Sequence, residues 1–354
     1  MAFSQLRPHD TVTDPESDSG AADRIEYLPG LSLADYRDFM AGFPRFRNVV
    51  VPSAARLAEV LPAIVDGNEF DTDEAGRGDS YRISQRSPTV RLAGIRRLLE
   101  TALDGPLPSQ VPPELRVLDV FGGDGTIVRA IGGLDPAYAA DPWILTGDLS
   151  RHMIAEAVRY GLPAVCQPAQ RLLLREDSFD AVVLAYGTHH LPVAERRTAY
   201  AEAWRVLKPG GRIVVHDFEE DGPVAGWFGE VVHRYAPNGH DYDHFTRSDL
   251  QRDLAAAGFG TVRVSDMYDP FAITAPTAEQ ASRQLVDYVS HMYGLFGLTA
   301  EDGWHEQLWQ LMCRHMVYPA ELATIPQVEV RPTDGGYIAT MPRVSLVGVG
   351  VKPA

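Results

Sequence analysis

The sequence is poor in cysteine, in clustered basic residues and in long apolar runs, and each shortage excludes a class of protein. Only two cysteines, Cys166 and Cys313, occur in 354 residues; neither has metal-site spacing, and a secreted disulfide framework would need more. The net charge is −16 without a Lys/Arg cluster, which argues against nucleic acid or an anionic membrane as partner. No segment approaches the roughly 20 apolar residues of a membrane span, and the N-terminus does not resemble a signal peptide. We therefore expect a cytoplasmic protein that acts on a small molecule.

The pattern of apolar residues changes several times along the chain. The N-terminus is acidic and Ser-rich, the next segment has helical periodicity, and from residue 115 short β-branched runs alternate with helical segments. Such alternation predicts βαβ units and a doubly wound parallel α/β sheet. The predicted parts are a disordered tail (1–24), an N-terminal helical lid or substrate region (25–110), a nucleotide-binding domain (111–270), a helical cap insertion (271–335) and the final strand of the sheet (336–354). An insertion of that length usually serves function or an oligomer contact such as a homodimer.

One glycine-rich turn follows the first predicted strand of the sheet. The run Val117-Leu-Asp-Val-Phe-Gly-Gly-Asp-Gly-Thr126 leads from a strand into a helix. Glycine suits this turn because the backbone bends sharply and a ligand can press against it without meeting a Cβ atom. The third glycine of a dinucleotide fingerprint is missing, since Val128 stands near its place. Taken alone, the turn is equally compatible with a plain strand–helix connection.

The sequence blocks that follow the turn favour a ligand-binding role for it. The strand Leu145-Thr-Gly-Asp-Leu ends at Asp148, where an acid accepts hydrogen bonds from ribose hydroxyls, and Ser150 can cap the next helix. Further along stand Ser-Phe-Asp-Ala-Val, His-His-Leu and Leu-Lys-Pro-Gly-Gly-Arg-Ile before another strand. In this order the blocks resemble class I S-adenosylmethionine (SAM) dependent methyltransferases over residues 117–217, and more weakly to about residue 265. The resemblance implies a Rossmann-like seven-stranded sheet with its last strand antiparallel, and an enzyme that transfers a methyl group from SAM.

The resemblance also implies residue roles. Asp119 would approach the methionine amino group, Asp148 would bind both ribose hydroxyls, and Ala185 would offer a carbonyl near the sulfonium. The remaining predicted cofactor contacts are Gly122, Gly123 and Gly125 along the methionine and ribose, Leu149, Ala169 and Gln170 beside adenine, and Tyr81 closing over SAM. Phe121 and Pro168 depart from the family pattern, at the first loop glycine and at an adenine-binding acid.

Residues that would bind the methyl acceptor are expected outside these blocks. Tyr81, Arg82 and Arg86 lie in a short polar segment, 79–86, ahead of a predicted helix. An arginine there could clamp a carboxylate, because guanidinium groups form bidentate pairs with carboxylates. A solvated charged turn is the alternative interpretation of the same segment.

Histidines mark the predicted catalytic edge. His189 and His190 follow the fourth predicted strand, and His216 ends the fifth. His240 and His244 fall in a loop before Thr246, which is placed to cap a helix, and His291 lies on a cap helix. We predict His189, His240 and His244 as catalytic residues, and His240, His244 and His291 as ligands of a divalent metal, with Zn, Fe or Ni as the candidates.

Three functions follow from this set. In the first, the metal chelates an α-keto acid and acidifies its β-carbon, and the enolate takes the methyl group, as in the bacterial α-keto acid β-C-methyltransferases of natural-product biosynthesis that the chain resembles more loosely. In the second, a metal-free O- or N-methyltransferase uses a histidine as general base on a small natural-product-like acceptor. In the third, the chain binds SAM without catalysing a reaction.

Overall fold

The computed structural model describes residues 26–50, 54–65, 70 and 78–354. The predicted disordered tail, 1–24, therefore lies outside the described residues. Within the described part of the chain, no helix combines the length and the apolar character that crossing a membrane requires.

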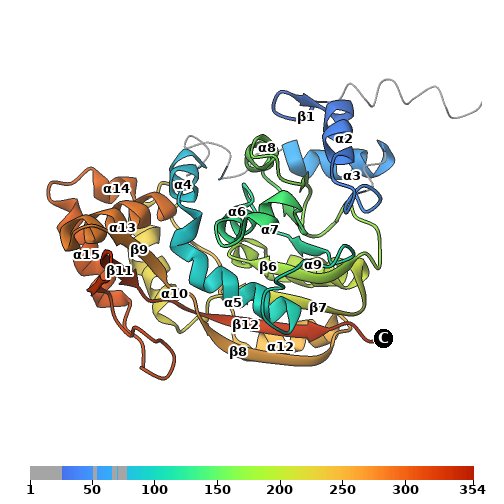
Figure 1. Cartoon of the computed structure of the whole chain (residues 1–354). Coiled ribbons are helices and arrows are strands. Elements are labelled where there is room, and N and C mark those ends of the chain that lie inside the picture. Colours follow the sequence, from blue (N-terminus) through green and yellow to red (C-terminus); the bar gives the residue numbers. More distant parts are fainter. Residues whose placement is uncertain (1–25, 51–53, 66–69, 71–77) are drawn as a thin grey trace, which may run out of the picture.

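A seven-stranded sheet forms the centre of the molecule, in the order β5-β4-β3-β6-β7-β12-β8 (Figure 1). Its strands are β3 (Val117–Asp119), β4 (Ile144–Asp148), β5 (Ala164–Cys166), β6 (Phe179–Ala185), β7 (Leu207–Asp217), β8 (Gly260–Tyr268) and β12 (Val344–Val351). Strands β3 to β7 pair in parallel, whereas β12 runs antiparallel to both β7 and β8. This confirms the predicted doubly wound α/β sheet with its last strand antiparallel.

Helices cover both faces of the sheet because alternate strand residues point to opposite sides. On β6, Val182 and Leu184 join one hydrophobic core, while Ala181 and Val183 join another. The first core is closed by α8 (Arg151–Arg159), α9 (Val193–Val206) and α12 (Arg247–Ala256), and the second by α5 (Leu92–Leu103), α6 (Thr126–Gly132) and α7 (Pro136–Ala140). Strands buried on both sides explain the continuous apolar runs in the sequence.

Two predicted helix caps fix where helices begin at the edge of this sheet. Ser150 Oγ accepts a hydrogen bond from Met153 N (3.2 Å) at the start of α8, and Thr246 Oγ1 accepts one from Asp249 N (2.9 Å) at the start of α12. Asp148 and the loop that carries His240 and His244 therefore lie outside helices, as predicted.

The N-terminal elements close the free edge of β5. They are β1 (Glu26–Leu28), β2 (Leu31–Ser32), α2 (Leu33–Ala41) and α3 (Ala54–Val65). Tyr27 Oη donates a hydrogen bond to Cys166 O (2.7 Å), and Tyr36 Oη donates one to Ala164 O (2.8 Å). Both rings are fully buried, so this segment covers backbone groups that an edge strand would otherwise expose.

The cap at the opposite end of the molecule contains a second sheet that the sequence analysis did not predict (Figure 1). Its predicted helices are present as α13 (Ala278–Tyr293) and α15 (Trp304–His315), with the short α14 (Phe296–Thr299) between them. Three antiparallel strands accompany them, in the order β10-β11-β9: β9 (Phe271–Ala275), β10 (Glu329–Thr333) and β11 (Gly336–Met341). The insertion is therefore mixed α and β, and its own hydrophobic core joins α13 and α15 to these strands.

Two more segments lie between the cap and the main sheet. The helix α4 (Gly78–Gln85) and the 3₁₀ turn η2 (Pro88–Arg91) precede α5, and α4 packs against α13. After β7 the chain forms α10 (Pro223–Trp227), the π-helical turn η4 (Phe228–Val232) and α11 (His233–Tyr235). Both segments reach the edge of the sheet where β3, β4, β6 and β7 end.

Candidate active site

The glycine-rich turn between β3 and α6 lies close against β4. Gly122 N donates a hydrogen bond to Gly147 O (2.8 Å), and a Cβ atom on Gly122 would stand 2.7 Å from Thr146 Cγ2. Gly123 and Gly125 have φ angles of 55° and 81°, a region that glycine adopts without strain. Gly122 is thus required by the close approach of the turn to the strand, and Gly123 and Gly125 suit the positive φ angles of the turn.

Asp148 ties this turn to the start of α8. Its Oδ2 accepts a hydrogen bond from Gly123 N (2.9 Å), and its Oδ1 accepts one from Ser150 N (2.9 Å). The carboxylate is partly exposed and faces a cavity at the carboxyl ends of the parallel strands. This is the crevice in which α/β sheets of this type bind their ligands.

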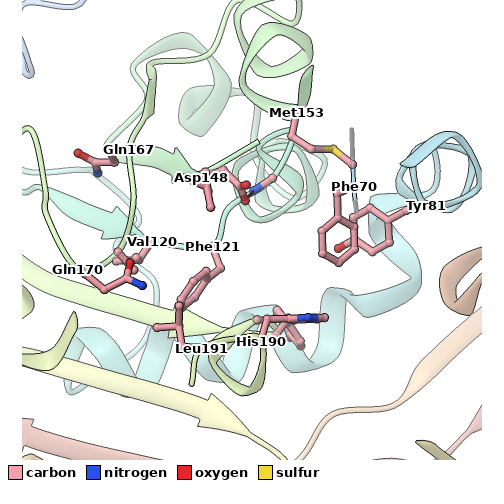
Figure 2. A pocket seen from close by; sticks show the side chains of 15 residues that line it. Phe70, Tyr81, Val120, Phe121, Asp148, Met153, Gln167, Gln170, His190 and Leu191 are labelled. Carbon is pink, nitrogen blue, oxygen red and sulfur yellow. Dashed lines mark hydrogen bonds between the residues drawn. The ribbon is translucent and has the colours of Figure 1, made fainter. Parts of the chain in front are cut away.

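The cavity beside Asp148, here called the cofactor cavity, is lined mainly by loops that follow β3, β4, β5 and β6 (Figure 2). Its lining includes six of the ten predicted cofactor residues: Gly123, Asp148, Leu149, Ala169, Gln170 and Tyr81. Gly122, Gly125, Asp119 and Ala185 adjoin it in the turn or at strand ends without lining it. Phe121, the departure from the family pattern, lies in the cavity wall beside Leu191.

Asp119 is a buried acid without hydrogen bonds at the end of β3. It is 2% exposed, and neither carboxylate oxygen has a hydrogen-bond partner among the described residues. Burial and the charge of Asp148 together raise the pKa of Asp119 to about 8, although the charge of Arg91 opposes the shift. A buried acid in this state favours a cationic partner, because pairing with a cation would remove the penalty of ionising it.

Gln167 is a polar residue of the cofactor cavity that the sequence analysis missed. Its side chain is 1% exposed; Oε1 accepts a hydrogen bond from Leu173 N (2.7 Å), whereas Nε2 has no partner among the described residues. Gln170, predicted to flank adenine, lines the same cavity and donates a hydrogen bond from its amide to Glu195. A buried amide with one end fixed and the other unbonded is a ready donor for a ligand acceptor atom.

A smaller cavity, here called the acceptor cavity, adjoins the first and shares four lining residues with it: Phe70, Tyr81, Tyr186 and His190. Its other lining residues are Arg91, His189, Phe218, Phe228, Met292, Tyr293 and Arg343. Tyr186, directly after β6, has a φ of 65° and donates a hydrogen bond from Oη to Asp269 Oδ1 (3.3 Å). A non-glycine residue held in this strained conformation is typical of functional sites.

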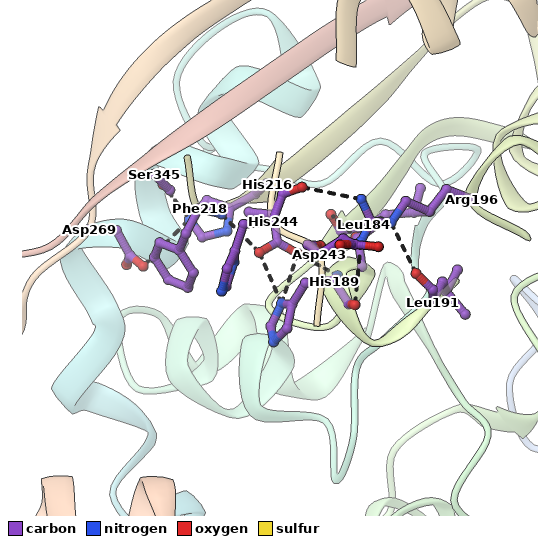
Figure 3. A network of polar contacts seen from close by, with 12 residues as sticks. Leu184, His189, Leu191, Arg196, His216, Phe218, Asp243, His244, Asp269 and Ser345 are labelled. Carbon is purple, nitrogen blue, oxygen red and sulfur yellow. Dashed lines mark hydrogen bonds and ion pairs between the residues drawn. The ribbon is translucent and has the colours of Figure 1, made fainter. Parts of the chain in front are cut away.

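His189, which lines the acceptor cavity (Figure 3), forms a buried pair with Asp217. His189 Nδ1 lies 2.9 Å from Asp217 Oδ1, and His189 N donates to Asp217 Oδ2 (2.8 Å). Burial alone would raise the pKa of Asp217, but the imidazole of His189 and the hydrogen bond from Phe218 N hold that pKa well below its ordinary value. The ionised carboxylate keeps the proton of the neutral ring on Nδ1 and leaves the Nε2 lone pair free; Nε2 has no partner among the described residues.

Comparison with known proteins identifies the cofactor. Residues 122–215 match the family model described as a methyltransferase domain. The chain is 31% identical over 199 residues to the ubiquinone/menaquinone biosynthesis C-methyltransferase UbiE of Sinorhizobium fredii, covering 49% of this chain and 75% of that protein. The chain belongs to the class I SAM-dependent methyltransferases.

Other relatives cover less of their own length or show lower identity. A demethylmenaquinone methyltransferase of Mycolicibacterium paratuberculosis is 31% identical over 125 residues, which are 35% of this chain and 50% of that protein. The crystal structure of a Bacillus halodurans protein described as a methyltransferase covers 73% of this chain and 99% of its own, with 19% identity and a TM-score of 0.44.

The residues of this methyltransferase fit SAM at three points. Asp119 is a buried acid whose carboxylate has no hydrogen bond from any described residue, and it suits the ammonium group of the methionine portion. Asp148 presents a carboxylate where ribose hydroxyls are expected, and Gln167 offers an unbonded amide donor in the same cavity. These are charges and hydrogen-bonding groups that SAM would satisfy.

Of the three predicted metal ligands, His240 and His244 lie together, with ring centroids 5.4 Å apart, but His291 does not join them. The rings of His240 and His244 lie 5.2 and 5.5 Å from that of His189, centroid to centroid, and stack on Phe228. His291 lines a separate surface groove, where its Nδ1 bonds to Asp287 O (2.7 Å) on its own helix. Among the described residues, no group of three or more His, Cys, Asp or Glu could hold a metal ion. The convergence predicted for His240, His244 and His291 is therefore corrected, because α13 turns His291 towards another face.

The other two predicted catalytic histidines, His240 and His244, lie beside His189. His240 and His244 contact His189 but are not among the residues that line either cavity. Burial and the charge of His189 lower the pKa of His244 to about 4, so that His244 is neutral and weakly basic. Of the three predicted catalytic histidines, only His189 faces a cavity.

The two arginines predicted to clamp a carboxylate, Arg82 and Arg86, lie away from both cavities. Arg82 pairs with Asp79 within α4, and Arg86 is exposed at the end of that helix, so neither lines a cavity. The segment 79–86 is thus mostly helix, where a turn was one interpretation. Arg91, five residues after Arg86, is the arginine that reaches the acceptor cavity, and no sequence motif distinguished it.

Proposed function

We propose that this methyltransferase adds a methyl group to a carbon atom of a small molecule, after His189 has removed a proton that makes this carbon nucleophilic. The β-carbon of an α-keto acid, which attacks as its enolate, is the acceptor type that we favour. The observation that carries the proposal is His189 itself: the residue lines the acceptor cavity, its Nδ1 is held by Asp217, and its buried Nε2 has no partner among the described residues.

The chain supplies the base and an apolar environment that excludes water from the reaction. SAM, when bound, would provide an electrophilic methyl group on its sulfonium. Asp217 stabilises the positive charge that His189 gains when it accepts the proton, and Phe218, Phe228 and Tyr293 surround the acceptor with apolar surface. His189 then returns the proton to solvent once the product has left. The residues present do not fit the predicted metal, so no step depends on one.

The carbon acceptor is supported by the relatives, several of which are named C-methyltransferases of ubiquinone and menaquinone biosynthesis. Aromatic rings activated by a hydroxyl and enolised α-keto acids share one chemistry, because proton loss from either gives an anion that attacks through carbon. The same base would equally activate a hydroxyl or an amine. O- or N-methylation is therefore the outcome that the experiment must distinguish.

The test uses SAM labelled with ¹³C in its methyl group and a panel of arylpyruvates, phenols and amines. Product NMR spectra separate methyl groups on carbon, oxygen and nitrogen by their chemical shifts. We expect a C-methyl product, and His189→Gln should lower kcat by about a hundredfold or more. His305→Gln, on α15 and outside both cavities, is the matched control. A methyl group on oxygen or nitrogen, or full activity of His189→Gln, would contradict the proposal.

A further inference from the structure

Two buried arginines line the acceptor cavity, and they differ in how their charge is balanced. Arg343 is 3% exposed; it forms an ion pair with Asp269, donates from Nε to Asp269 O (3.1 Å) and lies over the ring of Phe271. Arg91 is 5% exposed and forms no ion pair with any described residue. Since a guanidinium keeps its charge at any physiological pH, the group of Arg91, Arg343 and Asp269 carries one positive charge in excess.

Arg91 is held in place by neutral groups. Its Nη2 donates a hydrogen bond to Gln85 Oε1 (2.9 Å), its Nε has no partner among the described residues, and its guanidinium lies 4.6 Å from the ring centre of Tyr186. Gln85 is itself fixed by Thr126 at the start of α6. The side chain is therefore positioned by α4, α6 and the end of β6, with donors left over.

A buried cation without an anionic partner destabilises the protein unless a ligand supplies the anion. Arg91 also favours the ionisation of Asp119 and Asp124, but Asp119 lies at the glycine turn, where it suits the ammonium of SAM, and Asp124 forms an ion pair with Arg129. Arg91 lines the acceptor cavity and does not line the cofactor cavity. The remaining walls of the acceptor cavity are aromatic or apolar apart from His189, His190 and the already paired Arg343.

We infer that Arg91 is the binding site for the carboxylate of the methyl acceptor, and that the acceptor is a small aromatic carboxylic acid. The inference rests on the proposed function in assigning the smaller cavity to the acceptor. The carboxylate receives the free donors of Arg91, while the aromatic group packs among Phe218, Phe228 and Tyr293. This arrangement would place the carbon between carboxylate and ring beside His189.

The experiment measures binding, so it does not depend on turnover. The probes are 3-phenylpropanoate and its neutral amide, titrated by calorimetry into protein saturated with S-adenosylhomocysteine. We expect the carboxylate to bind the wild type at least about tenfold more tightly than the amide, because a hydrogen bond to a charged group contributes about 1.5–3 kcal/mol. Arg91→Met should remove this preference, Arg91→Lys should retain part of it, and the exposed Arg96→Met should leave it unchanged.

Other outcomes would overturn the inference. If S-adenosylhomocysteine binds Arg91→Met at least tenfold more weakly while 3-phenylpropanoate is unaffected, Arg91 serves the methionine carboxylate instead. If the wild type binds neither probe, or binds both equally, the acceptor is not an aromatic carboxylic acid. If instead His189→Gln retains turnover while the Arg91 results hold, the proposed function fails and the carboxylate site stands.

Discussion

The cofactor cavity and the acceptor cavity share one wall but are built from different parts of the chain. The first is lined mainly by loops at the ends of successive parallel strands, which the sequence carries in order between residues 120 and 191. The second combines side chains from η2, η4, α13 and the residue before β12, positions up to 252 residues apart in the chain between Arg91 and Arg343. Binding of the cofactor and reaction of the acceptor should therefore respond separately to substitution.

Asp217→Asn should give the largest difference between the effect on turnover and the effect on cofactor binding. This change removes the charge that stabilises protonated His189, so kcat should fall by about a hundredfold to ten-thousandfold. The affinity for S-adenosylhomocysteine should change by less than about twofold, because Asp217 lines neither cavity. Steady-state kinetics and calorimetry measure the two effects on the same preparation.

The control for this prediction is Asp221→Asn, which removes an exposed carboxylate from the loop after the same strand. Its kcat should match that of the wild type. A loss of cofactor binding as large as the loss of turnover in Asp217→Asn would show that the two cavities are not separable at this residue.

Gly94→Ala tests the packing that supports the acceptor side. Gly94 lies in the first turn of α5, where an added Cβ would stand 1.7 Å from Asp269 Oδ1, the acid that pairs with Arg343. We expect a loss of about 3 kcal/mol or more in the free energy of unfolding, measured with denaturant. Gly105→Ala, just beyond the same helix with open space around its Cβ position, should change it by less than about 0.5 kcal/mol. Equal effects of both substitutions would contradict this account of Gly94.

The contrast between the cavities also explains what the sequence could predict. The strands β3, β4, β6 and β12 and the cap residues Ser150 and Thr246 were predicted because each depends on a few neighbouring residues. The sheet of β9, β10 and β11 was missed, since β9 and β11 pair across about 60 residues and each strand is only five or six residues long. Pairing over such a distance leaves little trace in local periodicity.

The same dependence on local sequence explains which site residues could be predicted and which could not. Asp148 lines the cavity, and the sequence could single it out because it ends a recognisable strand. Arg91 and Gln167 were missed because their importance comes from what surrounds them. Among the described residues, Arg91 has no ion pair and the amide nitrogen of Gln167 has no hydrogen-bond partner. His291 was misplaced because helical spacing gives the face of a helix but not the neighbour that this face meets.

On the cofactor side, Asp119 predicts a pH dependence of binding. With its pKa raised to about 8 by burial, the free folded protein keeps a proton that the unfolded chain has lost above about pH 4. The stability of the free protein should therefore fall as pH rises towards 8. S-adenosylhomocysteine, whose ammonium favours the ionised acid, should bind about tenfold more tightly at pH 8 than at pH 6.

Calorimetry at both pH values provides the measurement, with Asp119→Asn as the comparison. The variant should bind about tenfold more weakly at pH 8, because it lacks the charge–charge contact. It should also show little change in affinity between the two pH values. A pH dependence that persists in Asp119→Asn would assign the proton to another group and leave the ammonium contact unsupported.

The smallest expected effect distinguishes two glutamines within the cofactor cavity. Gln167→Glu keeps the oxygen that accepts from Leu173 N but loses the unbonded amide donor, so the affinity for S-adenosylhomocysteine should fall by about tenfold or less. Gln170→Ala removes an amide already bonded to Glu195 and should change the affinity by less than about twofold. The reverse order would favour the predicted contact of Gln170 over one from Gln167, and would mean that burial with an unbonded donor does not identify a ligand contact here. Both residues line the cofactor cavity. Comparing the two variants therefore tests, within one cavity, whether burial with an unbonded donor identifies a ligand contact.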